Sequence, residues 1–141
     1  MALETERKEL FPAVVRAGVR HLLRNPDSGF YVIAEAGAQA AGSLMITKEW
    51  SDWRNGNFWW IQSVYVRPRF RRRGVYQRLY RYVQDLAADN RAVCGFRLYV
   101  ERENRRAQAA YRAVGMAKTR YLLFEELKPG VRFCRPASRT Y

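Results

Sequence analysis

Apolar residues recur along the chain with two different periods, and each period predicts a different kind of element. A helical period covers residues 6–23, 75–86 and 104–114. Pro12 marks an early turn in the first of these helices. Runs rich in β-branched and aromatic residues predict strands over residues 30–35, 42–49, 58–66, 92–100 and 121–126. The third strand is nearly all apolar, so we expect it to lie inside the sheet.

Turn residues between these segments support the same assignment. Asn55-Gly56 suits a tight hairpin turn that needs positive φ, and Gly115 suits the C-terminal cap of a helix. Residues 131–141 form a tail that either adds an edge strand or remains loose. The pattern as a whole predicts a single domain of mixed α/β structure over residues 1–141.

The composition narrows the class of protein. The chain has 141 residues, of which 48% are apolar and 28% charged, and this is typical of a globular domain. No apolar run approaches the ~20 residues of a membrane span, and the N-terminus carries no apolar signal segment. Cys94, Cys134 and the single His21 have no metal-site or disulfide spacing. We therefore expect no bound metal, no membrane association and a reducing, cytoplasmic location.

Positive charge dominates the chain and is unevenly distributed. The net charge is +13, arginine outnumbers lysine 22 to 4, and seven arginines with no acidic residue lie between Arg67 and Arg81. Such a balance also fits a nucleic-acid-binding module, but no helix-turn-helix, zinc finger or RNA-binding aromatic motif is present. A general arginine bias explains part of the excess. It does not explain the clustering of arginines, which are good bidentate partners for phosphate, beside one glycine.

The segment from Ile61 to Tyr80 has the pattern of an anion site. An apolar strand ends at Pro68, a turn rich in arginine and containing Gly74 follows, and a helical pattern then begins. Amides of such a turn, the dipole of the helix and the arginine charges all favour a bound phosphate. This segment is therefore our candidate ligand site.

The same residues resemble the acyl-CoA signature of the GNAT (GCN5-related N-acetyltransferase) superfamily. That signature, Arg/Gln-x-x-Gly-x-Gly/Ala, is similar to Arg71-Arg72-Arg73-Gly74-Val75-Tyr76, which follows Val64-Tyr65-Val66-Arg67-Pro68. The resemblance covers nearly the whole chain. It departs at Tyr76, where a small residue is usual, so this ring either narrows the loop or turns away along the helix.

A second motif supports the resemblance. Asn104 to Tyr111 is similar to the family's Asn-x-x-Ala-x-x-x-Tyr, and Gly115-Met116 follows where Gly-Phe is common. The resemblance implies that Asn104 caps the helix and contacts the cofactor or acceptor, while Tyr111 protonates the departing thiolate. Taken singly, the same residues are an ordinary N-cap and an ordinary half-buried aromatic.

The resemblance also implies a fold, a cosubstrate and its contacts. The fold would be of the α+β type, with helices flanking a mixed, mostly antiparallel central sheet. Acetyl-CoA would be the cosubstrate, and no metal would be needed. Its pantetheine arm would pair like an added strand with Val64, Tyr65 and Val66, and its pyrophosphate would be held by the amides of 72–76.

The two motifs do not identify the base that deprotonates the acceptor. Many members of the family use a glutamate on the central strand, and Gln62 stands at that position here. A glutamine side chain cannot accept the proton. Proton removal then falls to water, to the solvent before binding, or to Glu49, Asp52 or Glu101. Glu49 is our first choice because it ends the neighbouring strand beside the tryptophans, although such a residue is also an ordinary solvated charge.

The four tryptophans, Trp50, Trp53, Trp59 and Trp60, all fall within one predicted hairpin. Large aromatic side chains stabilise hairpins through cross-strand pairs, which accounts for the cluster without a ligand. The cluster equally fits an aromatic wall for the acceptor, with Trp50, Trp53, Trp60, Asp52 and Gln62 as contacts and Asp52 as the partner of a cationic amine. Both interpretations stay open.

The resulting hypothesis is an N-acetyltransferase that moves an acetyl group from acetyl-CoA to a primary amine of a small molecule or peptide by direct attack in a ternary complex. A CoA-binding relative without turnover is the alternative, and a nucleic-acid-binding module is less favoured. The strand and first helix that usually open the family are expected to be missing or shortened here. The sheet edge left open would be covered by a homodimer or by the C-terminal tail.

Overall fold

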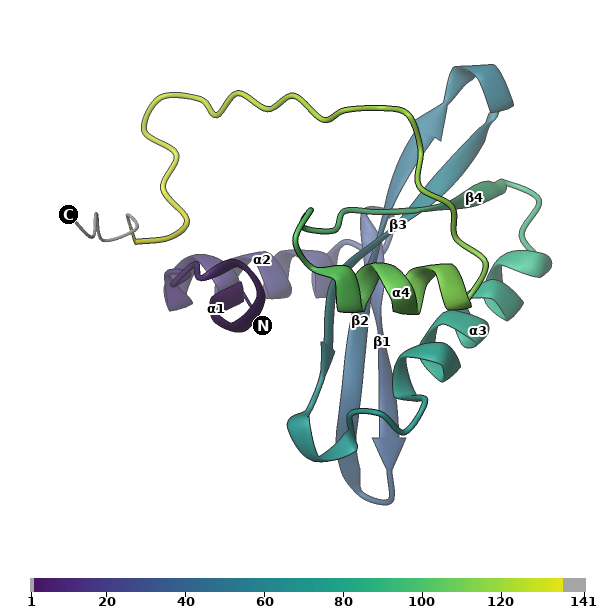
Figure 1. Cartoon of the computed structure of the whole chain (residues 1–141). Helices are drawn as coiled ribbons and strands as arrows, with labels where there is room; N and C mark the ends of the chain where they lie inside the picture. Colours follow the sequence, from purple (N-terminus) through teal and green to yellow (C-terminus); the bar gives the residue numbers. More distant parts are fainter. Residues whose placement is uncertain (1, 136–141) are drawn as a thin grey trace. The chain divides into compact units, whose positions relative to one another are not determined.

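The computed structural model describes residues 2–135 and divides them into two compact units. We call residues 20–99 the sheet unit, and residues 2–19 with 100–135 the terminal unit (Figure 1). The single domain that the sequence predicts stays a prediction.

The sheet unit contains four strands in the order β1-β2-β3-β4. Their bounds are Gly29–Ala36 for β1, Gln39–Ser51 for β2, Gly56–Val66 for β3 and Val93–Leu98 for β4. β1 pairs with β2, and β2 with β3, in antiparallel orientation. β4 pairs with β3 in parallel after the crossover helix α3 (Val75–Ala88). The predicted mixed, mostly antiparallel sheet is confirmed, and β3 lies inside it as expected.

One face of this sheet packs against α3. The helix contacts β1 and β2, and it buries Leu79 and Val83, which are four residues apart and therefore on one side of it. On the sheet, Leu44 and Ile46 are fully buried. Each such aliphatic side chain contributes roughly 1.5–3 kcal/mol, so this face is the core of the unit.

The opposite face of the sheet is polar, and strand register explains why. Ile46 pairs with Ile61 on the core side, so the next pair, Thr47 with Trp60, points the other way. Trp60 in turn pairs with Arg97 of β4. This face therefore collects side chains from three strands.

The turn between β2 and β3 is longer than the tight turn at Asn55-Gly56 that the sequence predicts, because Ser51 pairs with Gly56 and residues 52–55 lie between them. A short 3-10 helix, η1 (Asp52–Arg54), ends at Asn55, whose φ of 42° lies in the left-handed region. Asparagine tolerates this conformation better than most residues. The expected positive φ is confirmed at Asn55.

The terminal unit contains helices and a short β-bridge. Its helices are α1 (Ala2–Glu6), the first part of α2 (Pro12–Arg24) and α4 (Arg105–Ala113). Leu10 forms the isolated bridge with Cys134. The predicted first helix is thus wrong in its start: proline at the first position of α2 fits a helix N-terminus, and Arg7, with φ 54°, interrupts the chain before it.

Two other sequence-based expectations need correction. Residues 121–126 do not form a strand, and Phe124 is 89% exposed. Four consecutive large apolar residues, 121–124, give no one-sided face, and a strand without a neighbour is not stable alone. In the tail, residues 131–135 contribute only the bridge, and the rest of the predicted edge strand lies outside the described residues.

The outer edge of β1 remains open within the described sheet. β1 is the first strand in the order, and residues 2–28 ahead of it contain helices and no strand. The expected homodimer that would cover this edge stays a prediction. No helix among residues 2–135 is long and apolar enough to cross a membrane.

Candidate active site

The loop between β3 and α3 has the backbone of an anion site. After the 3-10 turn η2 (Pro68–Phe70), Arg72 and Gly74 adopt left-handed φ values of 62° and 72°, and α3 begins directly afterwards. Gly74 has no side chain to cap the helix, so the first amides of α3 stay available to a ligand. The neighbouring Arg73 is exposed, as is Arg72. The predicted Arg71–Tyr76 segment therefore combines amides, a helix dipole and free positive charge.

Arg71, unlike the exposed Arg72 and Arg73, contacts the end of β3. Its Nε donates a hydrogen bond of 2.9 Å to the carbonyl oxygen of Val66, and its guanidinium lies 5.9 Å from the ring centre of Tyr65. These contacts hold the loop against the C-terminal end of β3. Arg71 thus holds the shape of the loop, while Arg72 and Arg73 carry its exposed charge.

The end of β3 is irregular in the way a ligand-binding strand requires. The β2–β3 register shifts between Ser43/Met45 and Tyr65/Gln62, which places a bulge in β3. Ser63 takes a φ of 50° at this bulge, a conformation that costs a non-glycine residue about 1–2 kcal/mol. The bulge turns nearby peptide groups away from the β2 ladder.

The other edge of β3 is open over the same stretch. β4 pairs with β3 only from Asn57 to Ile61, so residues 62–66 face no strand on that edge within the described part of the chain. An open edge offers backbone N–H and C=O groups to an extended amide-containing ligand. Val64, Tyr65 and Val66, the predicted cofactor contacts, lie on this half-buried stretch.

Tyr76 is turned along the helix. Its ring stacks on that of Tyr80, with centroids 6.1 Å apart and planes at 20°. This geometry corresponds to the second of the two arrangements considered for this position. The departure from the family signature at Tyr76 is therefore accommodated by α3 rather than by the loop.

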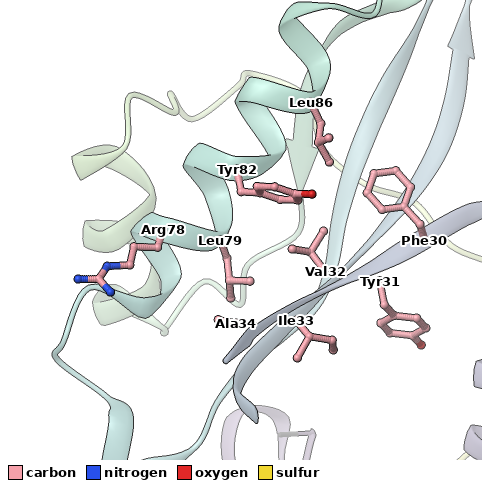
Figure 2. A pocket seen from close by; sticks show the side chains of 9 residues that line it. All are labelled: Phe30, Tyr31, Val32, Ile33, Ala34, Arg78, Leu79, Tyr82 and Leu86. Carbon is pink, nitrogen blue, oxygen red and sulfur yellow. The ribbon is translucent and has the colours of Figure 1, made fainter. Parts of the chain in front are cut away.

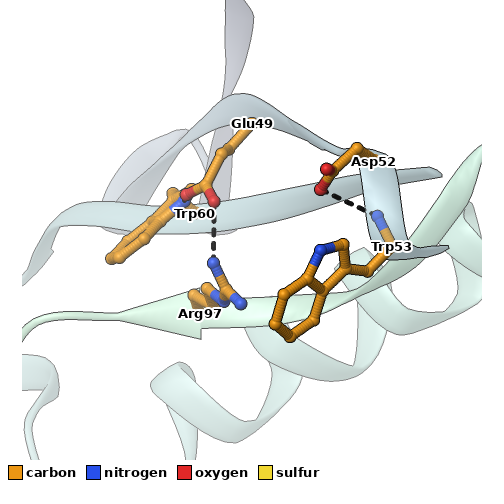
Figure 3. A network of polar contacts seen from close by, with 5 residues as sticks. All are labelled: Glu49, Asp52, Trp53, Trp60 and Arg97. Atoms are coloured by element: carbon orange, nitrogen blue, oxygen red, sulfur yellow. Dashed lines mark hydrogen bonds and ion pairs between the residues drawn. The ribbon is translucent and has the colours of Figure 1, made fainter. Parts of the chain in front are cut away.

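Three side chains meet on the polar face of the sheet (Figure 3). Both oxygens of the Glu49 carboxylate accept hydrogen bonds, Oε2 from the indole of Trp60 and Oε1 from Nη1 of Arg97 at 2.7 Å. The Arg97 guanidinium also lies 3.7 Å from the ring centre of Phe58. Glu49 is the residue that the sequence favours as a base, and the structure holds it as an oriented, ion-paired carboxylate.

Arg97 was missed in the sequence. The signal that could have found it is the alternation of β4, since Arg97 is the one charged residue in the otherwise uncharged strand Val93–Leu98. A charge there is expected to find a partner on the neighbouring strand. Which partner it finds depends on the register of three strands.

The other predicted acceptor contacts are distributed around this cluster. Gln62 donates to Thr47 Oγ1 at 2.6 Å, and Asp52 Oδ1 accepts the backbone N–H of Trp53 at 2.8 Å. Trp60 packs on Tyr99 with ring centroids 4.4 Å apart. Trp53, on η1, is 83% exposed.

The structure separates the four tryptophans. Trp59 is a core residue whose ring meets Phe30 edge-on at 5.2 Å. Trp50 shares the side of β2 on which Ile46 lies, because the strand alternates with a period of two, so Trp50 points away from the side of Glu49. Trp60 alone of the strand tryptophans joins the Glu49 cluster.

The second predicted motif lies in the terminal unit, on α4. Asn104 is the N-cap of this helix, its Oδ1 accepting the N–H of Ala107 at 3.0 Å. Tyr111 is half-buried, and burial raises the pKa of its hydroxyl. Gly115 closes the segment with φ 90°, as expected of a C-terminal cap. Glu101, the remaining candidate base, is exposed and precedes this helix.

A groove of about 390 Å³ opens elsewhere on the sheet unit, between β1 and α3 (Figure 2). It is lined mainly by apolar side chains, among them Phe30, Val32, Leu79 and Leu86. None of the residues predicted for the site lies in it. Among the described residues, no cluster of three or more His, Cys, Asp or Glu side chains could hold a metal ion.

The chain is similar to known acetyltransferases. Residues 2–116 match the acetyltransferase (GNAT) family. A possible acetyltransferase from Clostridium difficile 630 has a solved structure that matches with 41% identity and a TM-score of 0.83, over 90% of this chain and 84% of that one. No curated protein sequence matches the chain.

More distant solved structures share the fold alone. The aminoglycoside acetyltransferase AAC(6')-Iy in complex with a bisubstrate analogue matches with 21% identity and a TM-score of 0.71, over 84% of this chain and 81% of its own. An integron cassette protein from the mobile metagenome of Cole Harbour Salt Marsh matches with 21% identity and a TM-score of 0.73, over 85% of this chain and 74% of its own. The family match spans most of the chain and the 41% identical relative covers nearly all of it, so the resemblance read from the two motifs is confirmed: the chain belongs to the GNAT family and is an acetyltransferase.

Proposed function

We propose that this enzyme transfers an acetyl group from acetyl-CoA to a primary amine of a small molecule or peptide, by direct attack within a ternary complex. The observation that carries the proposal is the end of β3. There an open strand edge at 62–66, with the bulge at Ser63, leads directly into the basic loop ahead of α3. One continuous stretch of backbone thus suits both parts of CoA.

The residues present fit CoA. The amides of 72–76 and the exposed Arg72 and Arg73 would hold the pyrophosphate, because the left-handed residues turn the backbone toward the start of α3. The open edge of Val64 to Val66 would pair with the amides of the pantetheine arm. The AAC(6')-Iy structures solved with CoA and with a CoA-based bisubstrate analogue agree with such a ligand for this fold.

The chemical step that we propose assigns a role to each of the predicted residues. Acetyl-CoA supplies a thioester, whose carbonyl carbon is attacked by the lone pair of the amine; the C–N bond forms as the C–S bond breaks. Backbone N–H groups near Val64 would stabilise the negative charge that develops on the carbonyl oxygen. Tyr111 would donate its proton to the departing sulfur, with Asn104 holding the start of its helix. Burial raises the pKa of Tyr111, so its hydroxyl is protonated at neutral pH, as a proton donor must be.

The amine must lose a proton, and Glu49 stays our first choice to receive it. Its carboxylate is oriented by Trp60 and Arg97, and an oriented carboxylate can attract and deprotonate an ammonium ion. Asp52, Glu101 and water are the alternatives, since Gln62 cannot act as a base. The acceptor contacts proposed beside Glu49 are Trp53, Trp60, Asp52 and Gln62, with Trp50 the least well placed.

A thermal-shift titration with acetyl-CoA tests binding. We expect stabilisation of the wild type, because a ligand that binds only the folded state raises its stability, and loss of that stabilisation in the Arg71→Ala/Gly74→Glu double variant. No shift of the wild type at saturating acetyl-CoA would contradict the proposal. A salt-dependent DNA-binding assay on the same samples tests the nucleic-acid alternative.

Release of the CoA thiol over a panel of amines tests turnover. Polyamines, aminoglycosides, amino acids and peptide N-termini should be compared, because family membership alone does not identify the acceptor. Stabilisation by acetyl-CoA without thiol release from any amine would favour the alternative of a CoA-binding relative without turnover. We also propose a cytoplasmic location and a homodimer, the latter to be tested by light scattering.

A further inference from the structure

We infer that Arg97 selects the acceptor, and that the acceptor is an amine with a neighbouring carboxylate, of the α-amino-acid type, rather than a polycation. The inference rests on the proposed function. It concerns the polar face of the sheet unit, where Arg97 lies between Glu49 and Phe58. No sequence motif pointed to this residue.

Arg97 is held in one orientation. The ion pair with Glu49 fixes one Nη, and the ring of Phe58 supports the plane of the guanidinium from 3.7 Å away. The ring of Trp60 lies 5.9 Å away. A guanidinium fixed in this way loses little further entropy when it binds a second anion.

The guanidinium of Arg97 also has further N–H groups that can donate hydrogen bonds to a ligand. Among the described residues, Glu49 is the one side chain that accepts a hydrogen bond from it, and the Arg97 side chain remains 30% exposed. The planar arrangement of the remaining N–H groups matches the two oxygens of a carboxylate. The position is therefore suited to an anionic group on the acceptor.

The same ion pair makes the site a poor receptor for a polycation. With Arg97 beside it, Glu49 is available to one ammonium group, and Asp52 is the one further acid among the acceptor residues proposed above, which is too few for several cationic groups. The net charge of the chain points the same way, because it is +13. A net positive charge disfavours the approach of a polycation.

An aromatic surface adjoins the charged pair. Trp60 and Tyr99 pack together beside Arg97, and Tyr99 is more than half exposed. Aromatic faces of this kind accept apolar side chains. The acceptor that fits best is therefore an α-amino acid with an apolar side chain, whose carboxylate meets Arg97 and whose amine meets Glu49.

Four ligands test this assignment: leucine, leucinamide, isoamylamine (leucine without its carboxylate) and spermidine. Their binding to the protein is measured by calorimetry with and without saturating CoA, and their kcat/KM by thiol release. We expect leucine to exceed isoamylamine and leucinamide by roughly 10-fold or more, because a hydrogen bond to a charged group is worth that much, and spermidine to be the poorest.

Variants then assign the preference to Arg97. Arg97→Gln should weaken leucine binding by roughly 10- to 100-fold and raise its KM, while isoamylamine changes by less than about 3-fold. Arg97→Lys should recover part of the leucine preference. Arg54→Gln is the matched control, because Arg54 also lies over the Phe58 ring, at 5.1 Å, without an ion pair to Glu49.

Three results would overturn the inference: isoamylamine or spermidine binding as well as leucine, leucinamide matching leucine, or Arg54→Gln reproducing the loss seen in Arg97→Gln. The outcome is separable from that of the proposed function. If acetyl-CoA neither stabilises the protein nor releases thiol, the proposed function fails, and the ratio of leucine to isoamylamine binding measured without CoA still decides the role of Arg97.

Discussion

The two halves of the proposed site present different chemical groups to their ligands: backbone groups in one half and side chains in the other. The cofactor half, at the end of β3 and in the 71–76 loop, presents backbone groups through a bulge, two left-handed residues and the start of α3. The acceptor half, around Glu49, Trp60 and Arg97, presents side chains that come from three strands. Backbone groups persist when most side chains change, so cofactor binding should depend on the few positions that set φ. Acceptor choice should depend on single side chains.

The largest effect is expected at Tyr111, which serves turnover and not the binding of either partner. Tyr111→Phe should lower kcat by roughly 10²- to 10⁴-fold, the usual contribution of a general acid, while the affinity for acetyl-CoA stays within about 3-fold. Single-turnover thiol release beside calorimetry measures both. Tyr121→Phe, at an exposed tyrosine of the same unit, is the control. Unchanged turnover in Tyr111→Phe would exclude it as the acid.

Tyr111 also leads to a prediction for the pH dependence of stability. Burial raises the pKa of Tyr111, so its hydroxyl should stay protonated past the ordinary tyrosine value of about 10. Any stability linked to this group is complete at lower pH and is lost as the pH rises through the raised pKa, because there the folded state holds a proton that the unfolded state has released. A loss of stability that begins below pH 9 and disappears in Tyr111→Phe would contradict this direction.

Glu49 should show the next largest effect, and it acts on the acceptor half alone. Glu49→Gln should lower kcat/KM by roughly 10²-fold, since glutamine cannot accept the proton. Acetyl-CoA affinity should not change. Asp85→Asn, at an exposed carboxylate on α3 outside the proposed site, is the control. A loss of kcat/KM smaller than about 3-fold in Glu49→Gln would assign proton removal to water or to another carboxylate.

A substitution at Gly74 tests whether backbone conformation determines the affinity for acetyl-CoA. Gly74→Ala should weaken acetyl-CoA binding by about 10-fold, because φ 72° costs an alanine about 1–2 kcal/mol and the loop will relax away from it. Space is not the issue, as the nearest atom to an added Cβ is Gln77 Oε1 at 3.8 Å. Gly37→Ala is the control: its φ of 62° imposes similar strain in the β1–β2 turn, so stability should fall while affinity does not. Equal affinity losses in both would contradict the account.

The smallest effect is expected at the exposed arginines of the loop. Arg72→Gln should raise the Kd for acetyl-CoA by roughly 2- to 5-fold at low salt and by less at high salt, because exposed charges are screened. Arg91→Gln, an exposed arginine of the sheet unit outside the loop, should have no comparable effect. A salt-independent loss in Arg72→Gln would indicate a structural role instead of a charge contribution.

The same contrast explains what the sequence could and could not predict. The β3–α3 loop and the Asn104 cap are local features, each determined by a few adjacent residues, and both were found from the pattern alone. The Glu49–Arg97 pair joins residues 48 positions apart through strand register, and a single sequence does not show which side of each strand faces which.

The predicted strand over 121–126 and the apparent cluster of tryptophans were misjudged for the same reason. Strand formation over 121–126 needs a paired neighbour, and apolar composition does not supply one. The tryptophans looked like one cluster because they are close in sequence, yet the period of two places Trp59 in the core and Trp60 on the polar face. Residue type predicted the four strands of the sheet, but it also predicted one strand that has no partner, and it did not show which face each side chain takes.

The central claim, that one continuous stretch of β3 and its loop binds acetyl-CoA, is tested most directly by amide hydrogen exchange with and without the ligand. We expect acetyl-CoA to slow exchange at residues 62–66 and 72–76, while the β2–β3 turn around η1, at the other end of β3, is unchanged. Slowed exchange confined to other segments, such as those lining the groove between β1 and α3, would contradict the claim.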